Sequence, residues 1–422
     1  MDKIKIVDFK FQGKEWAHLL DVSSHVFDSL PRVKINHIST NEKYYLLLHI
    51  RQPFDVKDLI AGIPYNLYIK DLIESIPNDL FLLMQQGIVK PVINMMSEQW
   101  DLFNTYAWVE NRLGLTPDFG ETPYSKFIKN FTQRSVPEEN ITWIVPNNSH
   151  IEQVNFLRNK GYKIRCNFLM FDYFAYVLRG KALKQEIQPK EFKFKYGALV
   201  AGVSRNHRYA LIYNLWQNNL LKDGAISCNK FETLVEGKKN NWVDDTIDTD
   251  TYLRNFDNWD KNKQEFINAL PITYDKPIKQ LGEEKQQYIW GYLNESEVFK
   301  KFFLSIPSET KKEHDGIYLT EKTWKPIAYG NPFLIHGDNG SIQYLKDLGF
   351  QTFDKWWNED YDNKNDYDKI KDITKIVKTI CNEDINKMYK EMLPTLQHNR
   401  NQLIKFDQYS TIVKELENGI NS

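Results

Sequence analysis

The stretch KYGALVAGVSRNHRYALIYNLWQNNLLKDGAISC, from Lys195 to Cys228, decides the fold class. Its first part, Lys195–Ser204, is largely apolar and ends at the polar run SRNHR, as a buried strand does. Apolar residues then recur at helical spacing between Asn206 and Gly224, and a second short apolar run covers Ala225–Cys228. A strand, a helix and a strand in this order predict a βαβ unit with parallel strands.

The same alternation of short apolar runs with amphipathic segments continues on both sides of this unit. On the N-terminal side, five runs predict strands: Ile4–Phe11, Tyr44–Ile50, Lys90–Met96, Ile141–Pro146 and Tyr162–Phe171. On the C-terminal side, we expect a strand and two helices, the helices closed by Gly330 and Gly349: Phe302–Glu309, Glu321–Tyr329 and Ser341–Leu348. The pattern predicts an α/β protein with two Rossmann-like, doubly wound domains that face an interdomain cleft.

The expected domain boundary lies in a polar, strongly basic segment, Arg179–Gly197, which is typical of a linker. We therefore assign residues 1–190 to an N-terminal, acceptor-side domain and residues 191–362 to a C-terminal, nucleotide-sugar-binding domain. Residues 363–422 are predicted to form C-terminal helices that pack back on the first domain. A chain of 422 residues is too long for one ordinary core, which supports this division.

Composition excludes some classes of protein. The formal net charge of −1 argues against a surface devoted entirely to nucleic acid or to a membrane. The cysteines are three scattered residues, Cys166, Cys228 and Cys381, which indicate neither a disulfide framework nor a zinc site. No apolar run approaches the length that spans a bilayer. The expected location is the cytoplasm, that of the host if the protein is viral, and we expect no membrane partner.

Three polar residues stand where an apolar segment turns into the predicted helix at Glu321. Thr320 suits the N-cap position, so Glu321 and Lys322 fall in the first turn, where unpaired N–H groups favour an anion. Lys322 adds positive charge, and the Glu321 carboxylate can accept hydrogen bonds from ribose hydroxyls. The alternative interpretation is that Glu321 complements the helix dipole in an exposed turn while Lys322 is solvated.

A second polar cluster occupies the corresponding place in the βαβ unit. Arg205 and Arg208 can pair with phosphate oxygens, and His207 can donate a further hydrogen bond. Taken alone, the cluster is also compatible with an ordinary basic turn. Two such clusters at strand-to-helix turns of one domain favour a diphosphate site, as a nucleotide sugar requires.

The segment FFLSIPSETKKEHDGIYLTEKTWKPIAYGNPFLIHG resembles the donor-binding signature of the family 10 glycosyltransferases, the α1,3-fucosyltransferase group. Four residues match the Tyr-x-Thr-Glu-Lys helix start of that family: Tyr318, Thr320, Glu321 and Lys322. Ser308 and Glu309 stand near the Glu-Asn-Ser-like triplet, and Arg208 matches the upstream arginine. Over Lys193–Asp362 the sequence looks still more like uncharacterised glycosyltransferases of tailed phages and other large viruses.

The resemblance implies a GT-B architecture and an inverting sugar transfer without an obligatory metal, with a nucleotide-diphosphate sugar as donor and no other cofactor. It also implies a general base, a Glu just after a strand of the first domain. Glu98 follows Lys90–Met96 and takes that place, with Asp101 as a substitute. The alternative is that Glu98 is an ordinary first-turn residue of the following helix.

The acceptor expected from the viral resemblance is a hydroxymethylated base in phage DNA, flipped from the duplex. The segment from Arg179 to Arg208 is rich in basic residues, which suit a nucleic-acid backbone. Aromatic residues interleave with lysines in KEFKFKYG of this segment and in the earlier YSKFIKNF, and such rings suit a stacked base. A charged, solvated linker explains the same segment. Other interpretations are transfer to a surface glycan or protein, and a non-catalytic nucleotide-sugar or DNA-binding module.

Three Asp-x-Asp pairs superficially resemble a metal motif: Asp248 with Asp250, Asp360 with Asp362, and Asp366 with Asp368. They lie in acidic stretches, so we interpret them as solvated loops, and we expect no metal site. The sequence contains neither a Walker loop nor a Gly-x-Gly-x-x-Gly fingerprint, which argues against a phosphotransferase or a dehydrogenase.

Overall fold

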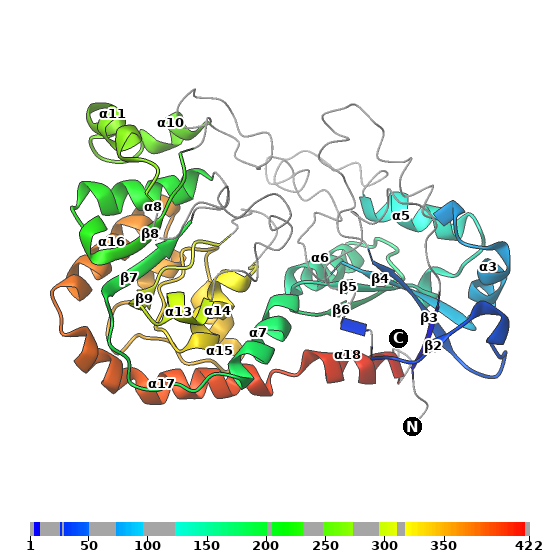
Figure 1. Cartoon of the computed structure of the whole chain (residues 1–422). Helices are drawn as coiled ribbons and strands as arrows, with labels where there is room; N and C mark the ends of the chain where they lie inside the picture. Colours follow the sequence, from blue (N-terminus) through cyan, green and yellow to red (C-terminus); the bar gives the residue numbers. More distant parts are fainter. Residues whose placement is uncertain are drawn as a thin grey trace. The chain divides into compact units, whose positions relative to one another are not determined.

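The computed structural model describes residues 4–8, 26–27, 29–49, 73–95, 123–200, 205–230, 248–272, 295–309 and 317–417. The chain forms two compact units (Figure 1). The first contains Met1–Tyr176, Glu313–Tyr318 and Asp407–Ser422. The second contains Val177–Lys312 and Leu319–Phe406.

The first unit is built on a six-stranded parallel sheet with the order β2-β1-β3-β4-β5-β6. Its strands are β1 (Lys5–Val7), β2 (Arg32–Val33), β3 (Tyr44–His49), β4 (Val89–Asn94), β5 (Thr142–Val145) and β6 (Asn167–Met170). Because β1 lies between β2 and β3, the strand order reverses at β1, as it does in doubly wound sheets.

Alternate residues of β3 enter two different cores, because successive side chains of a strand point to opposite faces. Tyr44, Leu46 and Leu48 pack in a cluster with residues of three helices. These helices are α3 (Asn78–Gln85), α5 (Pro123–Thr132) and α6 (Asn148–Asn159). Tyr45 and Leu47 belong to a second cluster. Both faces of the sheet are therefore covered, which explains why its strands read as continuous apolar runs.

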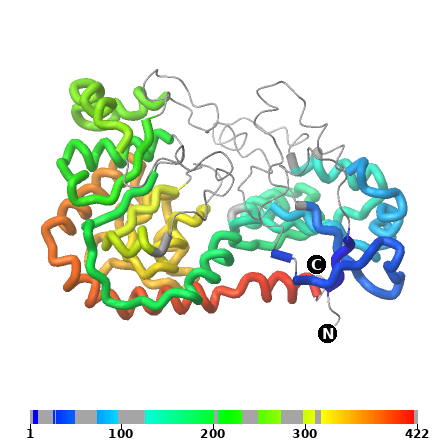
Figure 2. Tube along the Cα trace, in the orientation of Figure 1, coloured from blue at the N-terminus to red at the C-terminus, as the bar shows by residue number. Residues whose placement is uncertain are grey.

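The C-terminal helix α18 (Gln408–Glu417) packs in this second cluster, so the chain returns to its first unit at the end (Figure 2). Ile412 and Leu416 are buried there. The Tyr45 hydroxyl donates a hydrogen bond to the Leu416 carbonyl. The Ser29 and Tyr409 hydroxyl oxygens lie 2.7 Å apart. Helix α7 (Tyr173–Leu183) begins at the end of the first unit and continues into the second.

The second unit is built on a parallel sheet with the order β8-β7-β9. Its strands are β7 (Phe194–Leu199), β8 (Gly224–Ser227) and β9 (Phe302–Ser305). Isolated parallel bridges pair Ser305 with Phe333 and Ser308 with His336, so the segment after α14 extends the sheet beyond β9. The strand order reverses at β7, which places the carboxyl ends of β7 and β9 at a topological switch point.

The described part of the second unit contains, besides the end of α7, these α-helices: α8 (Asn206–Gln217), α10 (Thr249–Leu253), α11 (Trp259–Ala269), α13 (Glu295–Phe299), α14 (Glu321–Tyr329), α15 (Ser341–Asp347), α16 (Asp366–Cys381) and α17 (Ile385–Lys405). Helix α16 packs against α8 and β7, and α17 packs against α14. No helix among the described residues is long and apolar enough to cross a membrane.

The predicted α/β class with doubly wound parallel sheets is confirmed, but several element bounds differ from expectation. The strands predicted to reach Ser204 and Glu309 end at Leu199 and Ser305, and two further differences have a visible cause. The strand predicted from Tyr162 is limited to Asn167–Met170, because the Arg158 side chain donates to the Ile164 and Cys166 carbonyls and holds the preceding segment as a loop. The helix predicted to reach Gly224 ends at Gln217, where Asn219 has a left-handed backbone with φ of 57°.

Candidate functional site

The polar residues predicted from the sequence gather at the switch point of the second unit. Arg205 is the N-cap residue of α8, which follows β7, and His207 and Arg208 lie in the first turn of that helix. Ser308 and Glu309 follow β9. The first turn of α14 continues the same group, as its contacts with Glu309 establish. The carboxyl ends of parallel strands and the N-termini of the following helices meet at one edge of a sheet, which accounts for this grouping.

Helix α14 begins as the sequence predicts. Thr320 is its N-cap, and the Thr320 hydroxyl accepts a hydrogen bond from the Lys322 N–H at 3.4 Å. Glu321 is the first helical residue, and Gly330 ends the helix with a left-handed φ of 69°. Glycine suits that position because a side chain would clash with the backbone and meet Ile187 at 2.8 Å.

Lys322 is the cation that reaches the surface at this helix start, with 24% of its side chain exposed. Its ammonium lies 3.0 Å from both the Thr320 hydroxyl and the Glu321 carboxylate, and 4.0 Å from the Glu309 carboxylate. The charge of Lys322 is therefore balanced by two carboxylates.

Glu321 is buried, in contrast to the alternative interpretation of an exposed first-turn residue. Burial by itself raises the pKa of the Glu321 carboxyl, but the Lys322 and Lys325 ammonium groups and the hydrogen bond from Lys322 outweigh burial. The pKa of Glu321 consequently lies below its ordinary value. Glu321 is ionised at neutral pH and acts only as a hydrogen-bond acceptor.

The basic cluster of α8 is joined to the segment after β9 by hydrogen bonds between buried groups. The Arg208 guanidinium donates to the Ser308 carbonyl at 3.2 Å, and the His207 ring lies 2.9 Å from the Glu309 carbonyl. The Ser308 hydroxyl lies 3.0 Å from Nδ1 of His336. The rings of His207 and His336 meet edge to face, with centroids 5.2 Å apart. The two clusters therefore form one hydrogen-bonded assembly.

Two members of this assembly were not anticipated from the sequence. His336 completes the contact to Ser308, and Thr323 donates its hydroxyl to the Glu309 carboxylate at 2.7 Å. The signal for His336 is its place at the end of the apolar run PFLI, which continues the sheet beyond β9. Thr323 carries no such signal, because a threonine in a first turn most often serves the helix alone.

Tyr318 and the predicted base are not among the contacts described above. Tyr318 belongs to the first unit, where its ring centroid lies 6.2 Å from that of Phe174. Glu98, the predicted base, and Asp101, its substitute, lie outside the described residues.

The basic segment before α8 uses several of its cations to hold carbonyl groups of its own unit. Arg179 donates to the Ile404 carbonyl at 2.7 Å, Lys190 donates to the Tyr329 carbonyl at 2.6 Å, and Lys195 donates to the Glu383 carbonyl at 2.7 Å. These cations therefore have structural roles.

The interleaved aromatic residues are part of the cores. Tyr124, Phe127 and Phe131 of YSKFIKNF are buried in the larger core of the first unit. Tyr196 of KEFKFKYG is fully buried, and Phe192 packs edge to face on Tyr389 at 4.9 Å between ring centroids. These rings are packed against other side chains of the protein, which does not favour the interpretation that they stack a base.

The Asp-x-Asp pairs also contribute to the fold. Asp248 caps α10 through the Thr251 N–H, and Asp250 accepts hydrogen bonds from Trp259 and Lys263. Asp362 is buried and accepts from the Ile342 N–H at 2.9 Å, in contrast to the expected solvated loop. Asp360 lies in a 3-10 turn, and Asp366 and Asp368 lie in the first turn of α16. The described residues contain no group of three or more His, Cys, Asp or Glu able to hold a metal ion.

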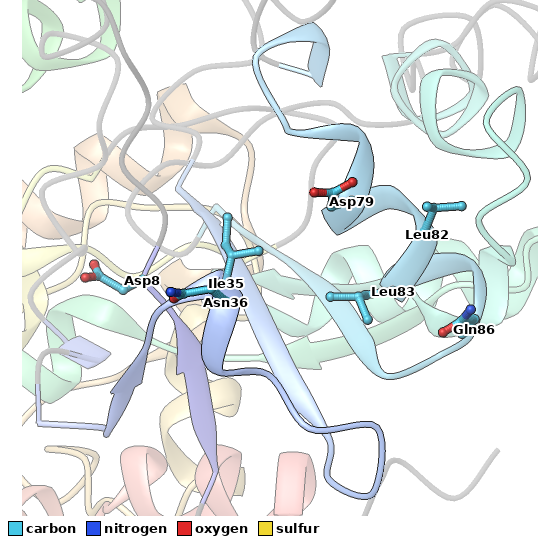
Figure 3. A pocket seen from close by; sticks show the side chains of 7 residues that line it. All are labelled: Asp8, Ile35, Asn36, Asp79, Leu82, Leu83 and Gln86. Carbon is cyan, nitrogen blue, oxygen red and sulfur yellow. The ribbon is translucent and has the colours of Figure 1, made fainter.

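A hollow of about 610 Å³ lies in the first unit, between the end of β1, the 3-10 turn Ile35–His37 and α3 (Figure 3). It is lined by Asp8, Ile35, Asn36, Asp79, Leu82, Leu83 and Gln86. None of the predicted site residues lines it. Its two charged residues are acidic, so the hollow opposes binding of a diphosphate.

Solved structures similar to the chain include two of β-glucosyltransferases. No family model matches the chain, and no curated protein matches it. One solved structure is the DNA modifying enzyme β-glucosyltransferase, studied with and without its substrate uridine diphosphoglucose; it is 11% identical, with a TM-score of 0.40 and coverage of 99% of this chain and 100% of that one. The other is T4 phage β-glucosyltransferase, 12% identical, with a TM-score of 0.38 and full coverage of both chains.

Proposed function

We propose that the protein is an inverting glycosyltransferase that moves a sugar from a nucleotide-diphosphate sugar to an acceptor hydroxyl. One observation carries the proposal: a buried, ionised Glu321 stands beside the partly exposed Lys322 at the first turn of α14, at the switch point of a doubly wound unit. Ligands of such sheets bind outside the carboxyl ends of the strands at this point. A cation and a hydrogen-bond acceptor side by side suit the phosphate and the ribose of one nucleotide.

The donor-binding roles follow from charge and position. Lys322 pairs with the diphosphate once its ammonium leaves the Glu321 carboxylate. Arg205 and Arg208 add positive charge from the start of α8. Glu321 accepts hydrogen bonds from the ribose hydroxyls. As the bond to the sugar breaks, negative charge develops on the departing diphosphate, and a preorganised donor at such a position contributes about 2 to 4 kcal/mol to the transition state.

The acceptor side of the reaction is assigned to the first unit. The acceptor hydroxyl must lose its proton, and we propose Glu98, with Asp101 as the substitute, as the general base. The proposed acceptor is a hydroxymethylated base in double-stranded phage DNA. It is supported by the resemblance of Lys193–Asp362 to glycosyltransferases of tailed phages and other large viruses. The proposed family, the fucosyltransferase-like family 10, rests on the Tyr-x-Thr-Glu-Lys match.

The test is incubation of the protein with a panel of nucleotide sugars and with DNA that carries hydroxymethylated bases, followed by mass spectrometry of the nucleosides. We expect one nucleotide sugar to give a glycosylated nucleoside and to release its nucleoside diphosphate. If the diphosphate is released and the sugar is transferred to a glycan or peptide of a test panel but not to DNA, the acceptor is a glycan or a protein instead of DNA. Binding of a nucleotide without any transfer would make the protein a binding module.

A further inference from the structure

The N-terminus of α14 offers backbone N–H groups that an anion can bind, and one anion is already there. Oε1 of Glu309 accepts hydrogen bonds from the Thr320 N–H at 3.0 Å, from the Thr323 N–H at 3.1 Å and from the Thr323 hydroxyl at 2.7 Å. Its Oε2 pairs with the Thr320 hydroxyl. The carboxylate thus takes the position that a bound phosphate takes at other helix N-termini.

A ligand has no access to these donors unless Glu309 is displaced. Glu309, Thr320 and Thr323 are all buried, with exposed fractions of 0%, 3% and 0%. The backbone of Glu309 is fixed on both sides: its N–H donates to the His336 carbonyl at 2.9 Å, and its carbonyl faces the His207 ring at 2.9 Å. These contacts hold the carboxylate in place from the strand side.

The charge of Glu309 also acts on the neighbouring cation. Its Oε2 lies 4.0 Å from the Lys322 ammonium, which keeps Lys322 beside the helix start. A buried carboxylate repels a diphosphate, so Glu309 is unsuited to bind the donor directly. Its contacts instead fix the two threonines that precede and follow the Glu321–Lys322 pair.

We propose that Glu309 is a positioning residue whose carboxylate is the resident anion of α14, and that the diphosphate of the donor is therefore recognised by side-chain cations and not by the N–H groups of this helix. The second part rests on the proposed function. The sequence match alone places Glu309 among the donor-binding residues, so this assignment changes its role from ligand to support.

The test compares Glu309→Ala with Glu359→Ala, a matched control. Glu359 is also a buried carboxylate of the second unit that accepts from a backbone N–H and a threonine hydroxyl, and it lies 3.1 Å from Lys346. Thermal melting and calorimetric titration with UDP and GDP are measured with and without sodium formate, and sodium chloride controls for ionic strength. Formate is small enough to occupy the space of the missing carboxylate.

We expect both variants to melt earlier than the wild type. Only Glu309→Ala should lose nucleotide affinity, by about tenfold or more, because its helix start is no longer held. Formate should raise the melting temperature of Glu309→Ala and restore part of its nucleotide affinity, whereas the nucleotide affinity of Glu359→Ala should not respond to formate. Glu309→Gln, which keeps the volume and one acceptor oxygen, should fall between the wild type and Glu309→Ala.

Three results would overturn the proposal. Tighter binding of UDP or GDP by Glu309→Ala would mean that the phosphate takes the helix N-terminus once it is vacated. A folded Glu309→Ala without any response to formate would mean that the carboxylate is not the resident anion. If Glu309→Ala does not fold, wild-type affinity in Glu309→Gln overturns it. If the wild type binds neither UDP nor GDP, the proposed function is wrong. The effect of formate on the melting temperature of Glu309→Ala still shows whether the Glu309 carboxylate occupies the helix N-terminus.

Discussion

Two cations of the proposed donor site, Lys322 of α14 and Arg208 of α8, differ in their exposure and in their contacts. Lys322 is partly exposed and held by Glu321 at 3.0 Å, while Arg208 is buried and spends one donor on the Ser308 carbonyl. Because the Glu321 carboxylate is buried, the loss of Lys322 costs some stability, and the charge of Lys325 remains to offset that carboxylate. The loss of Arg208 also removes a contact between α8 and the segment after β9. Lys322 is therefore the cleaner probe of the donor site.

We predict that Lys322→Ala weakens the affinity for the nucleoside diphosphate of the donor by about tenfold to a thousandfold, as the loss of a charge-assisted phosphate contact does. Isothermal titration calorimetry measures the effect. Lys375→Ala controls for net charge, since Lys375 is an exposed residue of α16, with 78% of its side chain accessible. Unchanged affinity in Lys322→Ala would remove Lys322 from the proposed site.

At the scale of the element, α14 is held at both ends by groups from distant parts of the chain. Glu309 occupies its N-terminus, and the Lys190 ammonium approaches its C-terminus, 2.6 Å from the Tyr329 carbonyl and 3.5 Å from the Gly330 carbonyl. An anion at the N-terminus and a cation at the C-terminus both complement the helix dipole. The contacts at both ends hold α14 in place, and with it Glu321 and Lys322 in its first turn.

Lys190 gives this element a pH dependence. Burial, assisted by the charge of Lys300, lowers the pKa of Lys190 from 10.5 to about 8 in the folded protein. Below pH 8 both the folded and the unfolded chain carry the proton, and the cost of the buried charge is fully present. Between pH 8 and pH 10.5 only the unfolded chain retains the proton, so the contribution of Lys190 to the free energy of unfolding rises with pH.

We predict that the wild type gains about 1 to 3 kcal/mol in free energy of unfolding relative to Lys190→Met as the pH rises through this window. Urea denaturation of both proteins at several pH values gives the difference in their free energies of unfolding. The contributions of tyrosines and other groups that both proteins share cancel in this difference. Lys375→Met, at an exposed position, should run parallel to the wild type. A constant difference between the wild type and Lys190→Met would contradict the lowered pKa.

At the scale of the whole molecule, the chain contains two doubly wound units, each with its own reversal of strand order, at β1 and at β7. The proposal assigns donor binding to the second unit and proton removal to the first. Such a division has a kinetic consequence, because changes on the acceptor side should leave the binding of the nucleotide intact.

We predict that Glu98→Gln retains the nucleotide affinity of the wild type while turnover falls by about a hundredfold or more, because glutamine keeps the volume but not the basic site. Calorimetry and a transfer assay measure the two quantities. Asp101→Asn is the matched comparison: normal turnover in Glu98→Gln with loss in Asp101→Asn would move the role to Asp101. Full turnover in both variants would place the base elsewhere.

The sequence by itself determined the features that arise from neighbours along the chain. The apolar runs indicated the strands, and the predicted start of α14 at Glu321, its Thr320 cap and its closing Gly330 agree with the structure. Hydrophobic periodicity and capping act over a few positions, so one segment contains all the information that they need. The βαβ order then fixed the fold class, because parallel strands require a crossover between them.

Only the tertiary structure decided what the polar side chains of the site contact. Glu309 meets Thr320 across 11 positions, Ser308 meets His336 across 28, and His207 meets Glu309 across 102. In the sequence, a carboxylate after a strand that binds a ligand cannot be distinguished from one that binds the N-terminus of a helix in the same protein. Burial separates the two roles, because a buried charge must be paired where it stands, and the partner is set by how strands and helices pack.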